Sequence, residues 1–216
     1  MKNRQAILCI LLVVATFAGT AWMLPQLAIS IPVHWDMGGH VDRMGNRIEL
    51  FLPPVLMAAL LALWPVLPVI SPQRYGIDRF GQVWWFVCLA IHSAMAFMQV
   101  LLLSAASGHG VDMARAVPAG LAVLFVLLGN VMGKVKPNFW LGIRTPWTLA
   151  SERVWYATHR LAARSMTLAG VTGLVLVACN VPWMVTPVLV ASALWPAAWS
   201  LLYDRRLLRA GRHDDH

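Results

Sequence analysis

The sequence predicts an all-α membrane protein, a polytopic helix bundle with six transmembrane helices, a small structured external loop and an interfacial cytoplasmic amphipathic helix. Of its 216 residues, 59% are hydrophobic and 12% are charged, whereas soluble domains contain about 25% charged residues. Eleven Trp residues and a mean hydropathy of +0.67 point the same way. This composition excludes a soluble enzyme, a secreted disulfide scaffold, a disordered chain and a coiled coil.

Six apolar segments come close to the length of about 20 residues that a helix needs to cross a bilayer. Arg164 is the single charged residue inside them, and it lies in the first turn of the fifth segment, where its long side chain can reach the headgroups. A Lys, Arg or Asp at a helix centre costs about 2.5–3.5 kcal/mol. The predicted spans are residues 6–24, 51–70, 83–104, 116–133, 161–181 and 186–203.

The first span begins after the charged residues Lys2 and Arg4, as a signal peptide does. Its apolar stretch is long and has no small-x-small cleavage site before Pro25, so we interpret it as a retained signal anchor. The three cysteines of the chain lie inside apolar runs and are odd in number, which argues against a disulfide framework. We interpret them as small apolar side chains within helices; they are Cys9, Cys88 and Cys179.

The distribution of Lys and Arg predicts the orientation, because cytoplasmic loops carry an excess of these residues. If the N-terminus is cytoplasmic, only three of the 17 Lys and Arg residues lie on the external side, namely Arg43, Arg47 and Arg115. We therefore expect both termini in the cytoplasm. The other 14 are Lys2, Arg4, Arg74, Arg79, Lys134, Lys136, Arg144, Arg153, Arg160, Arg164, Arg205, Arg206, Arg209 and Arg212.

The first external loop, residues 25–49, is predicted to form a structure of its own. Residues 31–35 (Ile-Pro-Val-His-Trp) should be extended, because proline biases its neighbour away from the helix. Residues 36–39 (Asp-Met-Gly-Gly) predict a turn, and residues 40–42 can return as the second arm of a hairpin. Residues 44–47 predict another turn. We expect this hairpin to fold against the external ends of the helices.

Potential ligand-binding side chains occur along the hairpin in the pattern His-x-Asp-x-x-x-His-x-Asp. Four such groups can in principle bind a metal, although we expect none. A plainer interpretation is that the Asp residues cap turns while His34 and Trp35 lie at the headgroup level. A third interpretation is direct contact with an extracellular ligand. The external candidates are His34, Trp35, Asp36, His40 and Asp42.

The second informative loop, residues 134–160, is cytoplasmic in this topology and mixes aromatic with basic residues. Residues 136–138 (Lys-Pro-Asn) predict a turn, and the apolar Phe-Trp-Leu that follows should lie in the membrane interface. Thr148 or Ser151 can cap a helix that continues into the fifth span. This helix carries a basic stripe opposite an apolar side, which is typical of an interfacial amphipathic helix that contacts anionic lipid.

Arg144 is the residue of this loop to which the sequence gives the most specific hypothesis. It has a tryptophan on either side, and a cation–π contact with one of them would contribute about 0.5–2 kcal/mol. The guanidinium is placed to clamp an acidic group, which is Glu152, a lipid phosphate or a partner's carboxylate. With Asn138 and His159 it is expected to organise the loop. The candidate functional residues are Asn138, Trp140, Arg144, Trp147, Glu152, Trp155, His159 and Arg160.

Two motifs extend over most of the chain. The first is Leu-Pro at 24–25 followed by IPVHWDMGGHVDRMGN at 31–46, and the second is Gly-Asn at 129–130 followed by KPNFWLGIRTPWTL at 136–149, Trp155 and Thr-His-Arg at 158–160. The second motif resembles the signature of the SdpI-type family of bacterial membrane proteins, whose named member is an immunity protein. The first resembles the N-terminal domain of unknown function that often precedes the SdpI-type region.

The resemblance implies an N-terminal domain of unknown function, residues 1–70, and an SdpI-type four-helix membrane region, residues 71–216. It implies a multi-pass protein of the bacterial cytoplasmic membrane with two roles. One is protection against a secreted, membrane-active peptide toxin, and the other is signal transduction by holding a winged-helix transcriptional repressor at the membrane. The expected partners are therefore membrane lipid, the toxin outside and the repressor inside, without enzymatic activity, cofactor or direct contact with nucleic acid.

Two other functions stay open. A small-solute or proton-coupled transporter would use polar groups inside the spans, and His92 and Gln99 share a helix face. Their plainer role is hydrogen bonding between helices. A membrane-embedded enzyme would use the hairpin residues, or Glu152 with His159 on one helix face. The sequence shows no nucleophile with an adjacent base and no His-Glu-x-x-His motif.

Overall fold

The computed structural model describes residues 2–72, 76–77 and 80–211. Six of its helical segments are long and apolar enough to cross a membrane, which confirms the predicted fold class. The second is interrupted near Pro65, because proline has no N–H to continue the helical ladder. The helices are α1 (Lys2–Met23), α2 (Leu52–Leu63) with α3 (Val66–Val69), α4 (Gly81–Ala106), α5 (Met113–Met132), α7 (Glu152–Ala178) and α8 (Val185–Arg209).

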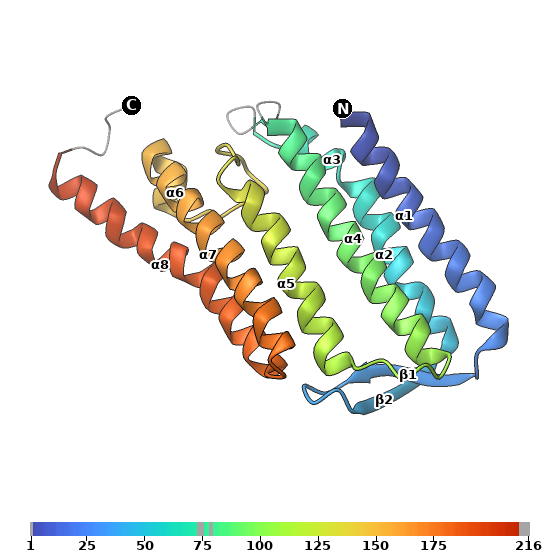
Figure 1. The fold of residues 1–216 in the computed structure, drawn as a ribbon. Helices are drawn as coiled ribbons and strands as arrows, with labels where there is room; N and C mark the ends of the chain where they lie inside the picture. The colour runs from blue at the N-terminus through green and yellow to red at the C-terminus, as the bar shows by residue number, and fades with distance from the viewer. Residues whose placement is uncertain (1, 73–75, 78–79, 212–216) are drawn as a thin grey trace.

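The helices run side by side in two groups, with α1, α2 and α4 on one side and α5, α7 and α8 on the other (Figure 1). The start of α1 and the end of α8 lie at one end of the bundle, and a small β-hairpin covers the opposite end. We call these the inner end and the outer end, after the orientation that the basic residues predict. Of those basic residues, Arg74, Arg79 and Arg212 lie outside the described residues.

The hairpin has the predicted form. Strand β1 (Ser30–Trp35) pairs antiparallel with β2 (Val41–Asn46), and the carboxylate of Asp36 accepts hydrogen bonds from the N–H groups of the turn. The predicted second turn at residues 44–47 is wrong, because β2 continues to Asn46. Asn46 then caps a short 3₁₀ helix, η2 (Arg47–Phe51), in a reciprocal capping box with Glu49.

Apolar and polar contacts hold the hairpin on the outer helix ends, as the sequence predicted. Ile31 of β1 is buried in a cluster with Leu27, Leu50 and Leu103 of α4. The Arg47 guanidinium donates hydrogen bonds to the main-chain oxygens at positions 24 and 27, at 3.2 and 2.8 Å, and so satisfies carbonyls that follow the end of α1.

Buried polar residues of α4 join the first group of helices. Gln99 donates from Nε2 to Thr20 Oγ1 of α1 at 2.8 Å and to the carbonyl of Leu50 at 2.9 Å. His92 lies about two helical turns before Gln99 on α4. Its Nε2 atom is 3.1 Å from the carbonyl oxygen of Met57 in α2. Both side chains therefore link neighbouring helices, which is the plainer of the roles that the sequence left open.

Small residues bring the second group together. A Cβ atom at Gly170 of α7 would collide with the carbonyl oxygen of Ala122 and the amide nitrogen of Val126 in α5. Close helix approach through small residues is typical of membrane proteins. Ala122 and Ala169 are buried there with Val185, which brings α8 into the same contact.

The predicted orientation can be tested with single cysteines in a Cys179→Ser background. His109→Cys, in the exposed outer connection between α4 and α5, should react with a membrane-impermeant maleimide in intact cells or spheroplasts. Ala150→Cys, exposed at the inner end, should react only after permeabilisation. Cys9 and Cys88 are fully buried and should not be labelled by the maleimide in either sample. The reverse labelling pattern would overturn the orientation.

Candidate functional site

The outer end of the bundle contains a cavity of about 450 Å³ beneath the hairpin. The hairpin and the outer ends of α4, α5 and α8 form its walls, together with the short 3₁₀ helix η5 (Pro182–Met184). Most of the wall is apolar, and Trp35 and Trp183 face it from opposite segments of the chain. The cavity therefore combines an apolar lining with polar groups at its hairpin edge.

Three of the five predicted external residues line this cavity, namely His34, Trp35 and Asp36. The other two lie on the hairpin and pair with them. His34 Nδ1 donates to Asp42 Oδ1 at 2.6 Å, which fixes the imidazole and leaves Nε2 free for a ligand. His40 Nδ1 lies 3.4 Å from Asp36 Oδ2.

Asp36 is the ionised group of the cavity edge. A hydrogen bond from the backbone N–H of His40 lowers the pKa of the Asp36 carboxyl below its usual value, and the His40 side chain and the N–H of Gly38 add to this. Hydrogen bonds to the charged form of a carboxyl favour that form. Asp36 therefore offers a negative charge next to an apolar cavity.

The hairpin's His and Asp side chains form two separate pairs in the described part of the chain, and they do not converge as one metal-binding group. Among the residues that the structure describes, convergence of three such side chains occurs elsewhere, at Cys9, Cys88 and His92 inside the bundle. The sequence analysis interpreted these cysteines as small apolar side chains, because they lie inside apolar runs and are odd in number.

At the inner end, the side chain of Asn138 organises the loop between α5 and α7. It is fully buried, accepts hydrogen bonds from the N–H groups of Trp140 and Leu141, and donates to the carbonyls of Lys136 and Leu141. One side chain thus satisfies four backbone groups of a turn that has no regular secondary structure. The expectation that Asn138 helps to organise the loop fits this arrangement.

His159 of α7 supports the next part of the loop. Its Nδ1 faces the carbonyl of Trp155 at 2.8 Å, and its Nε2 faces the backbone N–H of Ile143 at 3.0 Å. The first contact requires a proton on Nδ1 and the second requires a lone pair on Nε2, so the imidazole is neutral. The ring also stacks on Trp155 with centroids 4.0 Å apart.

Gly142 makes this arrangement possible. Its φ is +107°, and a Cβ atom there would collide with His159 Nε2. A side chain would therefore be strained at this position and would also displace the imidazole from Ile143. The sequence analysis did not identify this structural pairing, although the glycine before Ile-Arg-Thr-Pro was a visible signal.

Three tryptophans anchor the loop through their indole N–H groups. Trp140 donates to the carbonyl of Leu67 in α3 at 2.7 Å and to Ser71. Trp155 donates to the carbonyl of Val135 at 2.8 Å. Trp147 belongs to the short helix α6 (Pro146–Ala150) and donates to Ser200 Oγ of α8 at 2.7 Å. The loop is therefore bound to both groups of helices.

The contacts of Arg144 in the structure differ from those that the sequence predicted. Its guanidinium lies 5.8 Å from the ring centroid of Phe139, and neither neighbouring tryptophan holds it, because their rings turn inward to the hydrogen bonds above. In the described part of the chain it forms no ion pair with Glu152. Arg144, Phe139 and Glu152 are exposed, so this side of the loop is an accessible surface.

The predicted amphipathic helix forms the first turns of α7, which begins at Glu152 with Ser151 as its cap. Its apolar side is buried in protein, with Val154, Trp155 and Thr158 inaccessible to solvent. Arg160 is exposed on the opposite side. Both ring nitrogens of His159 contact backbone groups, and among the described residues no hydrogen bond or ion pair joins His159 to Glu152.

Comparisons with known proteins agree with the resemblance seen in the sequence. Residues 134–203 match the SdpI/YfhL protein family, and residues 11–58 match a domain of unknown function, DUF1648. The immunity protein SdpI of Bacillus subtilis (strain 168) is 24% identical over 170 residues, which are 77% of this chain and 78% of that protein. No solved structure is significantly similar. These matches confirm the resemblance that the two sequence motifs indicated.

The contact between Gly142 and His159 predicts a specific sensitivity of the inner loop. Gly142→Ala should destabilise the protein by about 1–3 kcal/mol, because the substitution adds strain at positive φ and a collision with the imidazole. Gly133→Ala is the matched control, since its Cβ would meet only ordinary van der Waals contacts. Thermal unfolding of both variants in detergent checks this. Equal stability of the two would contradict the assigned role of Gly142.

Proposed function

We propose that this chain is an immunity protein that protects its cell against a secreted, membrane-active peptide toxin, and that the outer cavity receives part of that toxin. The observation that supports this proposal most directly is that two regions of the chain together form the cavity wall. Its hairpin side comes from the region that matches DUF1648, and Trp183 and Thr186 come from the region that matches the SdpI/YfhL family. Residues from both regions thus line one cavity at the outer end of the bundle.

The chemistry of the cavity suits an amphipathic peptide. The apolar wall between Trp35 and Trp183 can accept an apolar side chain, and burial of such a side chain contributes about 1.5–3 kcal/mol. The ionised carboxylate of Asp36 at the edge favours a basic group next to it. His34, whose Nδ1–H donates to Asp42, presents the lone pair of Nε2 to a peptide N–H.

We further propose that the inner loop binds an intracellular partner, a winged-helix repressor of the kind that the resemblance implies. Support comes from the combination of a rigid frame and an exposed surface. Asn138 and His159 fix the backbone, while Phe139 and Arg144 remain accessible beside one another. A stacked arginine and an exposed aromatic ring are common anchors of protein interfaces.

The role of the cavity predicts the effect of changes in its walls. In a toxin-sensitive bacterium that expresses this chain, Trp35→Ala and Val117→Phe should each lower the tolerated toxin concentration at least tenfold, by removing a wall or by filling the space. Met44→Ala is the control, because Met44 lies on the same hairpin, is exposed and does not line the cavity. Membrane abundance must be equal in all three. Undiminished resistance in both cavity variants would remove the cavity from the mechanism.

The inner loop yields a separate prediction. Arg144→Ala and Phe139→Ala should reduce the toxin-dependent expression of a repressor-controlled transcriptional reporter several-fold, because less repressor is held at the membrane. Arg144→Lys should restore little, because lysine lacks the planar guanidinium that stacks on a ring. Lys134→Ala, which removes an exposed positive charge at the start of the same loop, is the control. If both Arg144 variants leave the reporter and the resistance unchanged, the inner loop is not a functional surface.

A further inference from the structure

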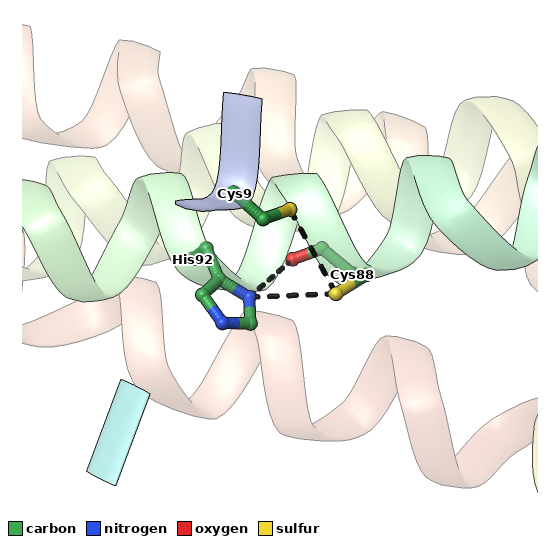
Figure 2. Close-up of side chains that lie close together, drawn as sticks. All are labelled: Cys9, Cys88 and His92. Carbon is green, nitrogen blue, oxygen red and sulfur yellow. Dashed lines mark hydrogen bonds between the residues drawn. The ribbon is translucent and has the colours of Figure 1, made fainter. Parts of the chain in front are cut away.

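We propose that Cys9, Cys88 and His92 form an intramembrane binding site for a thiophilic d¹⁰ cation, Zn(II) or Cu(I). Cys9 comes from α1, and Cys88 and His92 lie one turn apart on α4 (Figure 2). All three are fully buried, and both cysteines are free thiols. The site is distinct from the outer cavity and from the inner loop, and the proposal does not depend on the function proposed for either.

Two of the three distances between the potential ligand atoms already match those of a metal site. Cys9 Sγ lies 3.8 Å from Cys88 Sγ, and Cys88 Sγ lies 3.6 Å from His92 Nδ1. Around a tetrahedral zinc, with bonds of about 2.3 Å to sulfur and about 2.0–2.1 Å to nitrogen, the corresponding edges are about 3.8 and 3.6 Å. All three ligand atoms lie within 4.8 Å of one another. Little movement of the helices is therefore needed to close the site on a cation.

His92 gives a second, independent reason. Its Nδ1 lies 2.8 Å from the carbonyl oxygen of Cys88, and its Nε2 lies 3.1 Å from the carbonyl oxygen of Met57. A neutral imidazole has one N–H, so one of its nitrogens must point a lone pair at a carbonyl oxygen. A cation bound to Nδ1 would use the lone pair of that nitrogen, and Nε2–H would then donate to the carbonyl of Met57. A histidine ligand whose other ring N–H donates to a backbone carbonyl is the usual arrangement in metal sites.

The ligand set and its surroundings select the class of cation. Two sulfurs and one imidazole favour Zn(II) or Cu(I) over oxygen-seeking ions such as Mg(II) and Ca(II). Binding of Zn(II) would displace the two thiol protons, and the resulting complex of Zn(II), two thiolates and a neutral imidazole has no net charge. A complex without net charge avoids the high cost of an unpaired charge in an apolar interior. Cu(I) accepts three soft ligands and needs no fourth.

The position of the site allows a bound cation to act as a cross-link. Cys9 is seven residues from the start of α1, which places it about 10 Å into the bundle from the inner end. A cation there would join α1 directly to α4. The third cysteine, Cys179, is exposed beyond the end of α7 and belongs to no converging group among the described residues. It is therefore a matched control.

The test uses the reduced, full-length protein in detergent, with Zn(II) alone in one set of titrations and Cu(I) alone in another. Each cation competes with a colorimetric chelator, and the bound metal is counted by mass spectrometry after gel filtration. Wild type and Cys179→Ser should bind one equivalent of at least one of the two cations. The cation that the protein takes from the stronger chelator is the preferred ion. Cys9→Ser and Cys88→Ser should bind less than a tenth of an equivalent.

A third variant guards against misfolding of the serine variants. His92→Gln can keep a hydrogen bond to the carbonyl of Met57 but cannot supply the same ligand, so its affinity should fall at least tenfold while its gel-filtration profile and helical signal stay those of the wild type. Co(II) bound to the wild type should show a sulfur-to-metal charge-transfer band that these variants lack. Absence of stoichiometric binding of both cations, or binding that survives in the Cys9, Cys88 and His92 variants, overturns the proposal.

Discussion

Helices embedded in lipid have no water to satisfy their polar groups, so these groups must find partners within the protein. This constraint explains much of the arrangement described above. Gln99 reaches Thr20 and a main-chain carbonyl, and His92 reaches the carbonyl of Met57, so the polar side chains of α4 become links to α1 and α2. In the same way, Arg47 donates hydrogen bonds to the backbone carbonyls that follow α1, and these bonds hold the hairpin in place.

The same rule gives the two ends of the bundle different properties. At the outer end, a hairpin with few buried side chains rests on an apolar cluster and encloses a cavity whose edge carries Asp36 and His34. At the inner end, the loop has little regular secondary structure, and Asn138, His159 and three indole groups take up its backbone and side-chain hydrogen bonds. The outer end therefore offers a concave site, whereas the inner end offers a rigid surface.

In the inner loop, the observed contacts agree with the predicted ones for some residues and differ from them for another. Its three expected organisers were Asn138, His159 and Arg144, and the hydrogen bonds of the first two agree with that role. Arg144 is exposed beside Phe139, because the tryptophans expected to hold it are committed to partners in other helices. The guanidinium therefore stays accessible at the surface of the loop instead of forming part of its hydrogen-bonded frame.

The sequence by itself determined the six spans, the hairpin with its turn at residues 36–39 and the resemblance to the SdpI/YfhL family, and it offered Ser151 as one of two candidate caps for the helix that leads into the fifth span. These features depend on local composition, on turn-forming residues and on contiguous motifs. Only the tertiary structure decided which residues meet: Trp35 with Trp183 around one cavity, Gly142 against His159, and Cys9 beside Cys88, 79 positions later in the chain. Such contacts depend on helix rotation and helix packing, and hydropathy along a chain reports neither.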